Sequence, residues 1–270
     1  MRVTFDSQVL GRVAFPEKHK KDDKHACLEQ INAALQEGRL QGFVCESIGT
    51  LEPIKKVTRG KYFACRTPKS DVQILTEGDN TSVHISIKMD HDLHPGLHRM
   101  QVRRLQRART LGMRLLYVPS ANTLLPKEFL NDREFYESRL FETQSYADRF
   151  WQIATAIEAR GVGIAAITSI VDSIRDRLPA GTTASPSGMQ LLAYARNDEE
   201  RGRIAKAVSE WADGDLVACH IASGNDLLCT EDQGNSAGGP SILDDCNRSW
   251  LKATYGANIV SVPELAAQLD

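Results

Sequence analysis

Acidic side chains stand directly after two predicted strands of this chain. The apolar run MRVTF (1–5) leads into Asp6, and the run LLCTED places Asp232 just beyond a second buried strand. A third acidic group, Asp213 or Asp215 in the sequence ADGD, stands where we expect a helix to begin. In a parallel sheet, ligands bind in the crevice outside the carboxyl ends of the strands. Carboxylates delivered there favour a hard divalent cation, and we expect Mg²⁺ or Mn²⁺.

Alternating strands and helices must position these acids. Between predicted strands, segments such as 25–38 carry apolar residues at helical spacing. This alternation predicts an α/β sandwich with a mainly parallel sheet. Glu46 falls near the start of the helix that follows the second strand. Strands are predicted at 2–5, 42–44, 113–118, 161–167, 226–230 and 258–262.

The segment 60–145 differs in character from the rest. The alternating runs 72–75 and 83–87 predict a β-hairpin. A basic helix is expected next, closing at Gly112, and a short helix near 132–142. We interpret 60–145 as an insertion within one domain that spans 1–270.

The composition bounds the class of protein. The chain has 270 residues, 41% of them hydrophobic, and a net charge of −2, so overall charge favours no partner. Six cysteines are scattered without a CxxC pair, which is typical of buried thiols in a cytoplasmic protein. The first residues lack the apolar core of a signal peptide. The longest apolar runs are too short to span a bilayer, so we expect no membrane association.

Several of these segments together resemble the PIN-domain nucleases, which include bacterial toxins and RNA-processing ribonucleases. The segments are MRVTFDSQVL, GFVCESIGTLE, ADGDLVACHIA, LLCTEDQG and YGANIVSVPELAAQL. The resemblance implies a three-layer α/β/α fold and Mg²⁺- or Mn²⁺-dependent cleavage of single-stranded RNA. It also implies a homo-oligomer or an antitoxin-like protein partner.

The resemblance assigns roles residue by residue. Asp6 is similar to the family's first acid, Glu46 to the second, Asp215 to the third with Asp213 beside it, and Asp232 to the fourth. These residues would coordinate the metal, directly or through water. Thr230 corresponds to the family's strand-end threonine. Gln8 stands where the family usually has asparagine, and residues 60–145 exceed what a small toxin carries.

Each acid also has a structural interpretation. Asp6 would serve as a turn residue, Glu46 suits the first turn of a helix, and Asp213 and Asp215 are both good helix caps. The catalytic interpretation is favoured because the acids occur in the family's order. The arginines of the basic helix are either phosphate contacts or a solvated face; they are Arg103, Arg104, Arg107 and Arg109.

The hypothesis is therefore a metal-dependent endoribonuclease, with the basic helix and the loop 177–188 guiding the RNA. One alternative is a PIN-like scaffold that binds RNA or protein while its acids are idle. A second is a metal-dependent phosphohydrolase of small phosphate esters, which a DxD after the first strand would favour; Asp6 is followed by Ser7 and Gln8. A GxxxxGK[ST] phosphate loop is absent from the sequence, which argues against a nucleoside triphosphatase.

Overall fold

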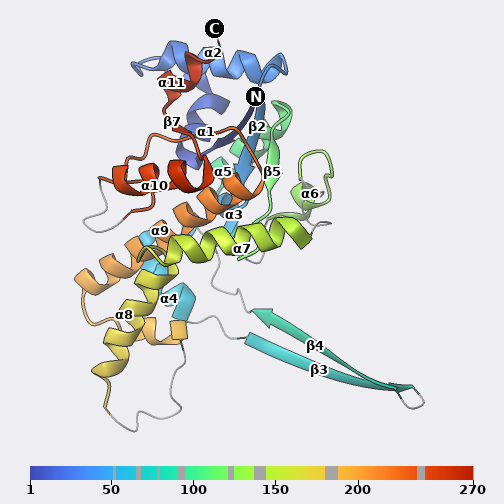
Figure 1. Cartoon of the computed structure of the whole chain (residues 1–270), viewed down its shortest axis with the longest axis vertical. Coiled ribbons are helices and arrows are strands. Elements are labelled where there is room, and N and C mark those ends of the chain that lie inside the picture. The colour runs from blue at the N-terminus through green and yellow to red at the C-terminus, as the bar shows by residue number, and fades with distance from the viewer. Residues whose placement is uncertain are drawn as a thin grey trace. The chain divides into compact units, whose positions relative to one another are not determined.

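The computed structural model describes nine stretches of the chain. They are 1–50, 53–64, 68–77, 80–89, 95–120, 125–136, 144–179, 188–235 and 241–269, with backbone alone at 50, 68–77, 80–89 and 144. The elements are β1 (Arg2–Phe5), α1 (Ser7–Ala14), η1 (Pro16–Lys18), α2 (His25–Gln36), β2 (Gln41–Cys45), α3 (Ser47–Thr50), η2 (Lys56–Thr58), α4 (Arg59–Ala64), β3 (Pro68–Glu77), β4 (Asn80–Met89), α5 (Arg99–Thr110), β5 (Arg114–Leu116), α6 (Lys127–Leu130), α7 (Gln144–Glu158), α8 (Ile164–Asp176), η4 (Gly188–Tyr194), α9 (Asp198–Ala222), β6 (Leu227–Cys229), α10 (Asp245–Tyr255), β7 (Ile259–Val260) and α11 (Val262–Ala266) (Figure 1).

The chain forms two compact units. Unit 1 comprises Met1–Pro53, Gly96–Ala166 and Lys206–Asp270, and unit 2 comprises Ile54–Pro95 and Ile167–Ala205. Two elements that lie within the 60–145 range, α5 and β5, belong to unit 1, and β5 supplies an edge strand of its sheet. That part of the range therefore contributes to the sheet that carries the acids.

Unit 1 is built on a five-stranded sheet with the order β5-β2-β1-β6-β7. All four neighbouring pairs are parallel, which confirms the α/β prediction. The chain adds β2 and β5 on one side of β1, and then β6 and β7 on the other. The connections therefore reverse direction between β1 and β6, and the crevice of a parallel sheet opens at such a switch point.

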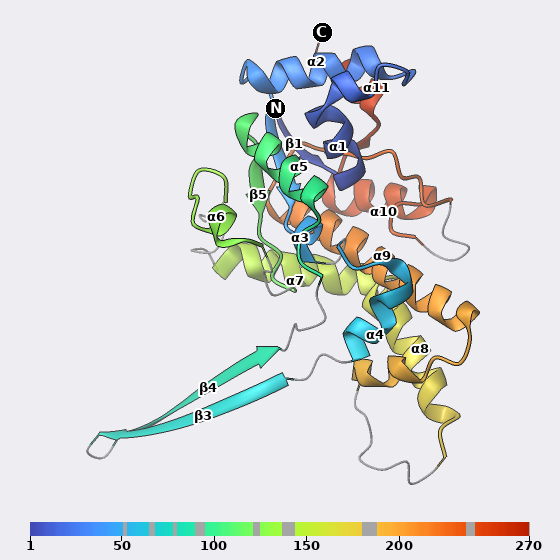
Figure 2. The same ribbon diagram turned by 180° about the vertical axis from the view of Figure 1, so that it is seen from behind.

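Helices cover both faces of this sheet. One buried cluster joins inward side chains of the strands, such as Val3 and Phe5, to α1, α2, α5 and α11. A second cluster joins the opposite side chains, such as Phe43 and Leu228, to α7, α9 and α10. Accordingly, α7 lies toward the viewer in Figure 1, whereas α5 does so in Figure 2. This arrangement is consistent with a three-layer α/β/α fold.

Two sequence predictions of local structure are wrong. The run 161–167 is not a strand: Gly161 and Gly163 adopt positive φ values of 80° and 63° in a turn, and α8 begins at Ile164. Its buried residues recur at helical spacing, at Ile167, Ile170, Val171 and Ile174. A short apolar run does not by itself distinguish a strand from a buried helix. The short helix expected near 132–142 falls mostly on 137–143, which lie outside the described residues, so it stays a prediction; α6 (Lys127–Leu130) precedes that range.

The helix that carries Asp213 and Asp215 begins much earlier than predicted. It is α9, which runs unbroken from Asp198 to Ala222, so both acids lie in its interior. Gly214 does not end this helix, because it lies against α7: a Cβ at Gly214 would be 3.4 Å from Ile157 Cγ2. Close packing between the two helices thus overrides the poor helix propensity of glycine.

Unit 2 contains a small helical core and the predicted hairpin. Arg59 of α4 is 8% exposed and donates from Nε to the Ile54 carbonyl and from Nη1 to the Ala205 carbonyl. Arg177 forms an ion pair with Glu200. Strands β3 and β4 pair antiparallel over ten residues each, which confirms the hairpin. Within the described stretches of both units, the helices are too short or too polar to cross a membrane.

Candidate functional site

Asp6 and Asp232 meet at the switch point of the sheet, and we call them the strand-end pair. Asp6 directly follows β1, and its backbone N–H donates to the carbonyl of Cys229 on the neighbouring strand β6. Asp232 lies three residues beyond the end of β6. Thr230 connects the two, because its hydroxyl donates to Asp6 Oδ2 at 2.8 Å and accepts from the Asp232 N–H at 3.1 Å. The predicted first and fourth acids and the predicted threonine are thus brought together.

The environment of Asp6 disfavours its negative charge. Burial raises the pKa of Asp6, and the charge of Asp232 raises it further. The Thr230 hydroxyl and the backbone N–H groups of Gln8 and Ser7 oppose this rise in pKa. Two carboxylates that repel one another at a half-buried position would gain from a bound cation.

Asp232 is fixed by backbone contacts on both sides. Its Oδ1 accepts from the Gly234 N–H at 2.8 Å, and its carbonyl accepts from Arg248 of α10. Gly234 has a φ of 70°, and a Cβ there would lie 2.7 Å from the backbone nitrogen of Asp244. Only glycine therefore fits this turn, and the turn holds the Asp232 carboxylate in place.

Glu46 lies at the end of β2, where α3 begins, and is 0% exposed. Its Oε2 accepts from the Val118 N–H at 3.3 Å and from the Tyr136 hydroxyl at 3.5 Å. Burial raises the pKa of Tyr136, and the nearby Glu46 charge adds to the effect. Glu46 is thus at the predicted strand end, and these two hydrogen bonds tie it to residues beyond β5.

Asp215 is enclosed beneath the end of β5. It is 3% exposed, and its Oδ2 accepts from the Ser120 hydroxyl at 2.7 Å. Burial raises the pKa of Asp215 to about 7; Ser120 opposes the rise in pKa and Glu158 of α7 adds to it. Asp213 is half-buried on α9, and Gln8 is exposed on α1. The structure therefore gives Asp215 and the strand-end pair different surroundings.

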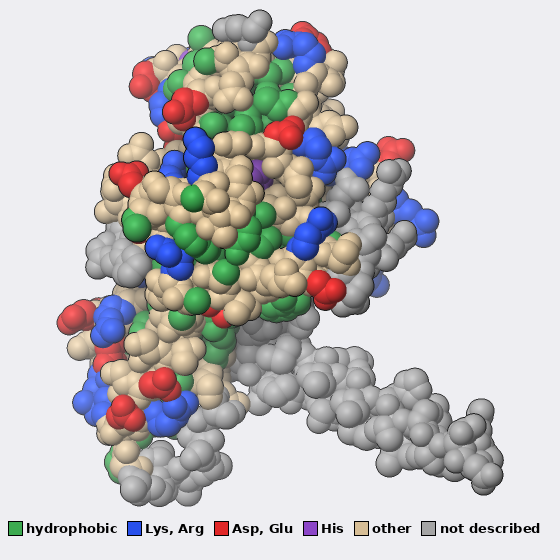
Figure 3. Space-filling view, in the orientation of Figure 1, with side chains coloured by type: hydrophobic (Ala, Val, Ile, Leu, Met, Phe, Trp, Pro, Cys, Tyr) green, Lys and Arg blue, Asp and Glu red, His purple; other side chains and the backbone are tan. Residues whose placement is uncertain are grey.

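The arginines of α5 lie on the other face of the sheet from α7. Arg103 is exposed, whereas Arg107 donates from Nε to the Ala14 carbonyl at 3.2 Å. Arg104 packs on α1, where a Cβ at Gly11 would lie 2.9 Å from its Cζ. Arg109 forms an ion pair with Asp132. On the α7 and α10 face, Figure 3 shows lysines and arginines scattered singly among the described side chains. Of the arginines proposed to contact RNA, Arg103 is the most open to solvent.

A further acid, Glu210 of α9, was missed by the sequence analysis. It is 8% exposed, its Oε2 is buried without a hydrogen-bond partner, and it interacts electrostatically with Asp232. Burial raises the pKa of Glu210, and hydrogen bonds from the Ser241 hydroxyl and the Ile242 backbone oppose this rise. The only sequence signal would have been its spacing of three residues from Asp213, which places both on one side of a continuous helix.

The donor chemistry of the strand-end pair fits a hard cation, although the geometry is not that of a complete metal centre. Among the described residues, no group of three or more His, Cys, Asp or Glu is arranged to hold a metal ion. The oxygens of Asp6 and Asp232 are nevertheless the donors that Mg²⁺ and Mn²⁺ prefer. Any further donors would have to come from a neighbouring acid or from water.

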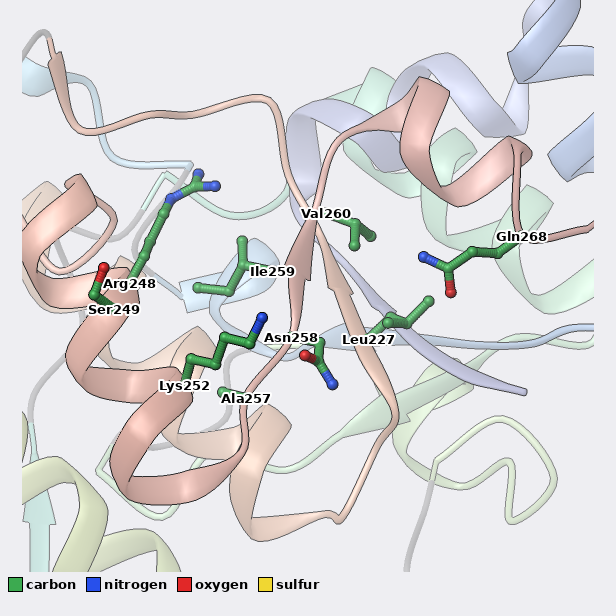
Figure 4. A pocket seen from close by; sticks show the side chains of 9 residues that line it. All are labelled: Leu227, Arg248, Ser249, Lys252, Ala257, Asn258, Ile259, Val260 and Gln268. Atoms are coloured by element: carbon green, nitrogen blue, oxygen red, sulfur yellow. The ribbon is translucent and has the colours of Figure 1, made fainter.

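A pocket of 490 Å³ lies along the edge strand β7 (Figure 4), and neither Asp6 nor Asp232 is among its lining residues. Arg248 and Lys252 of α10 line one side of it, and Gln268 lines the other. Arg248 also donates to the carbonyl of Asp232, so one side chain contacts both the pocket and the turn that holds the acid.

No protein-family model matches this sequence, and neither a curated protein nor a solved structure gives a significant match.

Proposed function

We propose that this protein is a metal-dependent endoribonuclease with a PIN-like fold, which hydrolyses phosphodiester bonds of single-stranded RNA. The observation that carries the proposal is the strand-end pair. Asp6 and Asp232 are joined through Thr230 at the switch point of a parallel sheet, where ligands of such sheets bind. The order of acids along the chain, which resembles that of the PIN nucleases, supports the reaction class.

In this proposal Asp6 and Asp232 hold Mg²⁺ or Mn²⁺. The bound ion would supply an activated water and stabilise the leaving oxygen. Thr230 holds the Asp6 carboxylate in one orientation through its 2.8 Å hydrogen bond. The Gly234 N–H does the same for Asp232. Glu46 and Asp215 remain proposed as the second and third acids, and as enclosed side chains they would act on the ion through water.

RNA would approach the strand-end pair from solvent. Both carboxylates are half-buried, so they keep an exposed side, whereas Asp215 is enclosed. The exposed guanidinium of Arg103 is the proposed phosphate contact on α5, with Arg104 and Arg107 beside it. The contacts of Arg104 and Arg107 with α1 leave them less free to follow a mobile strand.

Cleavage of a fluorescent single-stranded RNA tests the proposal. The wild type is assayed with Mn²⁺, with Mg²⁺ and with EDTA, beside the double variant Asp6→Asn, Asp232→Asn. A matched control, Asp23→Asn with Asp245→Asn, makes the same charge change at two exposed acids. We expect metal-dependent cleavage by the wild type and the control only. Intact RNA with every metal tried would overturn the nuclease proposal.

A PIN-like scaffold without turnover is the second candidate, and the enclosure of Asp215 favours it. The Asp215 carboxylate is 3% exposed and hydrogen-bonded to Ser120. It would have to leave this buried position before it could bind a cation directly. RNA binding that persists in EDTA without cleavage would support the scaffold. Hydrolysis of a small phosphate ester, with RNA left intact, would instead favour a phosphohydrolase.

A further inference from the structure

The pocket beside β7 combines apolar side chains with a cationic side. Its volume of 490 Å³ lies within the range of roughly 300–1,000 Å³ that is typical of small-molecule sites. Arg248 and Lys252 lie on one side of it and Gln268 on the other, with Ile259 and Val260 between them (Figure 4). The remaining lining residues are Leu227, Ser249, Ala257 and Asn258. A small ligand with an acidic group and an apolar or flat body suits such a lining.

The end of α10 and the start of β7 build this pocket. Arg248 and Lys252 are four residues apart in α10, so they project from the same face of the helix. Gly256 ends the helix in a left-handed conformation with a φ of 68°, and its N–H donates to the Lys252 carbonyl at 3.0 Å. The chain then enters β7 almost at once, which places the strand beside the two cationic side chains. The positive charge of the pocket is therefore held by the framework of helix and strand.

Both cations keep donors for a ligand. Arg248 donates from Nε to the Leu243 carbonyl at 2.7 Å and from Nη2 to the Asp232 carbonyl, which uses two of the five N–H groups of a guanidinium. Within the described stretches, neither Arg248 nor Lys252 forms an ion pair. The Glu264 charge also acts on Arg248, but this carboxylate is hydrogen-bonded at the start of its own helix, α11. The two cations are thus available to an anion, and a guanidinium fork matches the geometry of a phosphate.

An extended peptide is the other occupant that a cationic sheet edge suggests. In the part of the chain that the structure describes, β7 is the last strand of the sheet. The carbonyls of Asn258 and Val260 both accept from N–H groups on the β6 side, so within β7 only Ile259 directs its backbone groups outward. A peptide that adds a strand to a sheet is held by main-chain hydrogen bonds. One outward residue provides few of these bonds, so the pocket favours a small anion.

We propose that this pocket binds the phosphate of a nucleotide, with Arg248 and Lys252 contacting the phosphate and the apolar side chains of β7 contacting the nucleoside. The choice of a nucleotide among phosphate-bearing molecules rests on the proposed function. The side-chain amides of Asn258 and Gln268 supply donors and acceptors for the polar edge of a base. The nucleotide is either a residue of the RNA strand or a free mononucleotide, and both present the same chemistry to the pocket.

Arg248 also connects the pocket to the strand-end pair. Its Nη2 donates to the carbonyl of Asp232, so a phosphate on the same guanidinium would help to fix the turn that carries this acid. Because Arg248 has this structural contact, its replacement affects more than the pocket. Lys252 is exposed and has no such contact among the described residues, so it is the better residue for a test.

Nucleotide binding in EDTA tests the inference without metal and without cleavage. Adenosine monophosphate (AMP), and separately a single-stranded oligoribonucleotide without a terminal phosphate, are titrated calorimetrically into the wild type, Lys252→Gln and Lys127→Gln. Lys127 is an exposed lysine of α6 that does not line the pocket, so Lys127→Gln is the matched control. Lys252→Gln should bind AMP about 10-fold more weakly, the effect of one charged hydrogen bond, and the control should match the wild type. Arg248→Lys, which keeps the charge but loses the fork, should also weaken binding.

The oligonucleotide identifies the source of the phosphate. If Lys252→Gln weakens the binding of both ligands, and AMP displaces the oligonucleotide from the wild type, the pocket holds a nucleotide of the RNA strand. If Lys252→Gln weakens the binding of AMP alone, the pocket takes a free mononucleotide.

Two results would overturn the inference. One is that the wild type and Lys252→Gln have equal affinity for both ligands, or that neither ligand binds. The other is that a glutamate-rich peptide binds the wild type but not Lys252→Gln, and AMP does not displace it. The proposed function fails separately. AMP binding that depends on Lys252, in a protein that cuts no RNA with any metal, would keep the pocket and remove the nuclease, and metal-dependent cleavage without nucleotide binding that depends on Lys252 would do the reverse.

Discussion

The strand-end pair and Asp215 are acids at the same end of one sheet, yet their surroundings are opposite. Asp6 and Asp232 are half-buried, and a threonine and backbone N–H groups hold them at the switch point. Asp215 is enclosed between α9 and the residues after β5, with Ser120 as its donor. The difference shows that sequence order alone does not make a carboxylate available to a ligand.

The two regions also differ in how their charges are tolerated. Burial raises the pKa of Asp215 to about 7, so much of this carboxyl is protonated at neutral pH in the absence of a cation. Asp6 is also raised in pKa by burial, but four neighbouring groups act on it, and three of them favour the charge. A carboxyl group that is to bind a cation must be charged, as the neighbours of Asp6 favour, whereas the packed Asp215 can remain neutral.

The largest expected difference between the regions is in cleavage. Asp6→Asn should lower metal-dependent RNA cleavage on the order of 1000-fold, as loss of one electrostatic contributor does in an active site. Asp215→Asn should lower it less than about 10-fold, the lower limit for an outer contact of a metal site. Initial cleavage rates at saturating Mn²⁺ would measure both. Equal losses in the two variants would mean that Asp215 opens and joins the site.

A second difference should appear in stability against pH. Because the folded pKa of Asp215 lies near 7, above the ordinary 3.8, the native state binds the extra proton. This contribution to stability is complete below pH 3.8 and is lost as pH rises through 7. Without metal, Asp215→Asn should therefore be more stable than the wild type at pH 8, on the order of 3 kcal/mol, and similar at pH 4. Urea unfolding in EDTA at the two pH values would show it; a variant that loses stability at pH 8 would contradict an enclosed, neutral Asp215.

The smallest effects should come from the two hydroxyl groups. Thr230→Val removes the contact between the two acids of the strand-end pair, and Ser120→Ala removes the donor to Asp215. Each should cost about 1 kcal/mol of unfolding free energy, the typical value for one hydrogen bond. Only Thr230→Val should also weaken Mn²⁺ binding, by about 10-fold. Isothermal titration with Mn²⁺ would test this. Weaker Mn²⁺ binding in both variants would mean that the two regions belong to one metal site.

Much of the sheet could be predicted because its strands are short buried apolar runs. Runs such as RVTF and DLLC are too apolar for a surface loop and are bounded by polar residues, so five of the six predicted strands match strands of the sheet. The sixth, at 161–167, failed because glycine and alanine in a short run fit a buried helix equally well. Whether such a run forms a strand or a helix depends on how it packs against the surrounding elements, and this packing cannot be read from a single sequence.

The acids at strand ends were easier to place than those on helices. Asp6 directly follows β1 and Asp232 lies three residues beyond β6, so their positions depend mainly on strand boundaries. Asp215 and Glu210 depend on the rotation of α9 about its axis, which is set by contacts such as Gly214 against Ile157. The motif DGD resembled a helix start, and that interpretation hid both the continuity of α9 and the side on which Glu210 lies.

The position of β1 in the centre of the sheet has a consequence during translation. Its partner on one side, β2, follows within 45 residues, whereas β6 on the other side begins only at Leu227. At ribosomal speed this interval lasts on the order of ten to forty seconds. Until β6 has been synthesised, one edge of β1 has no partner strand and Asp6 has no Asp232 beside it. A nascent chain therefore carries only half of the strand-end pair, and under the proposed function we expect no RNA cleavage by it before that interval ends.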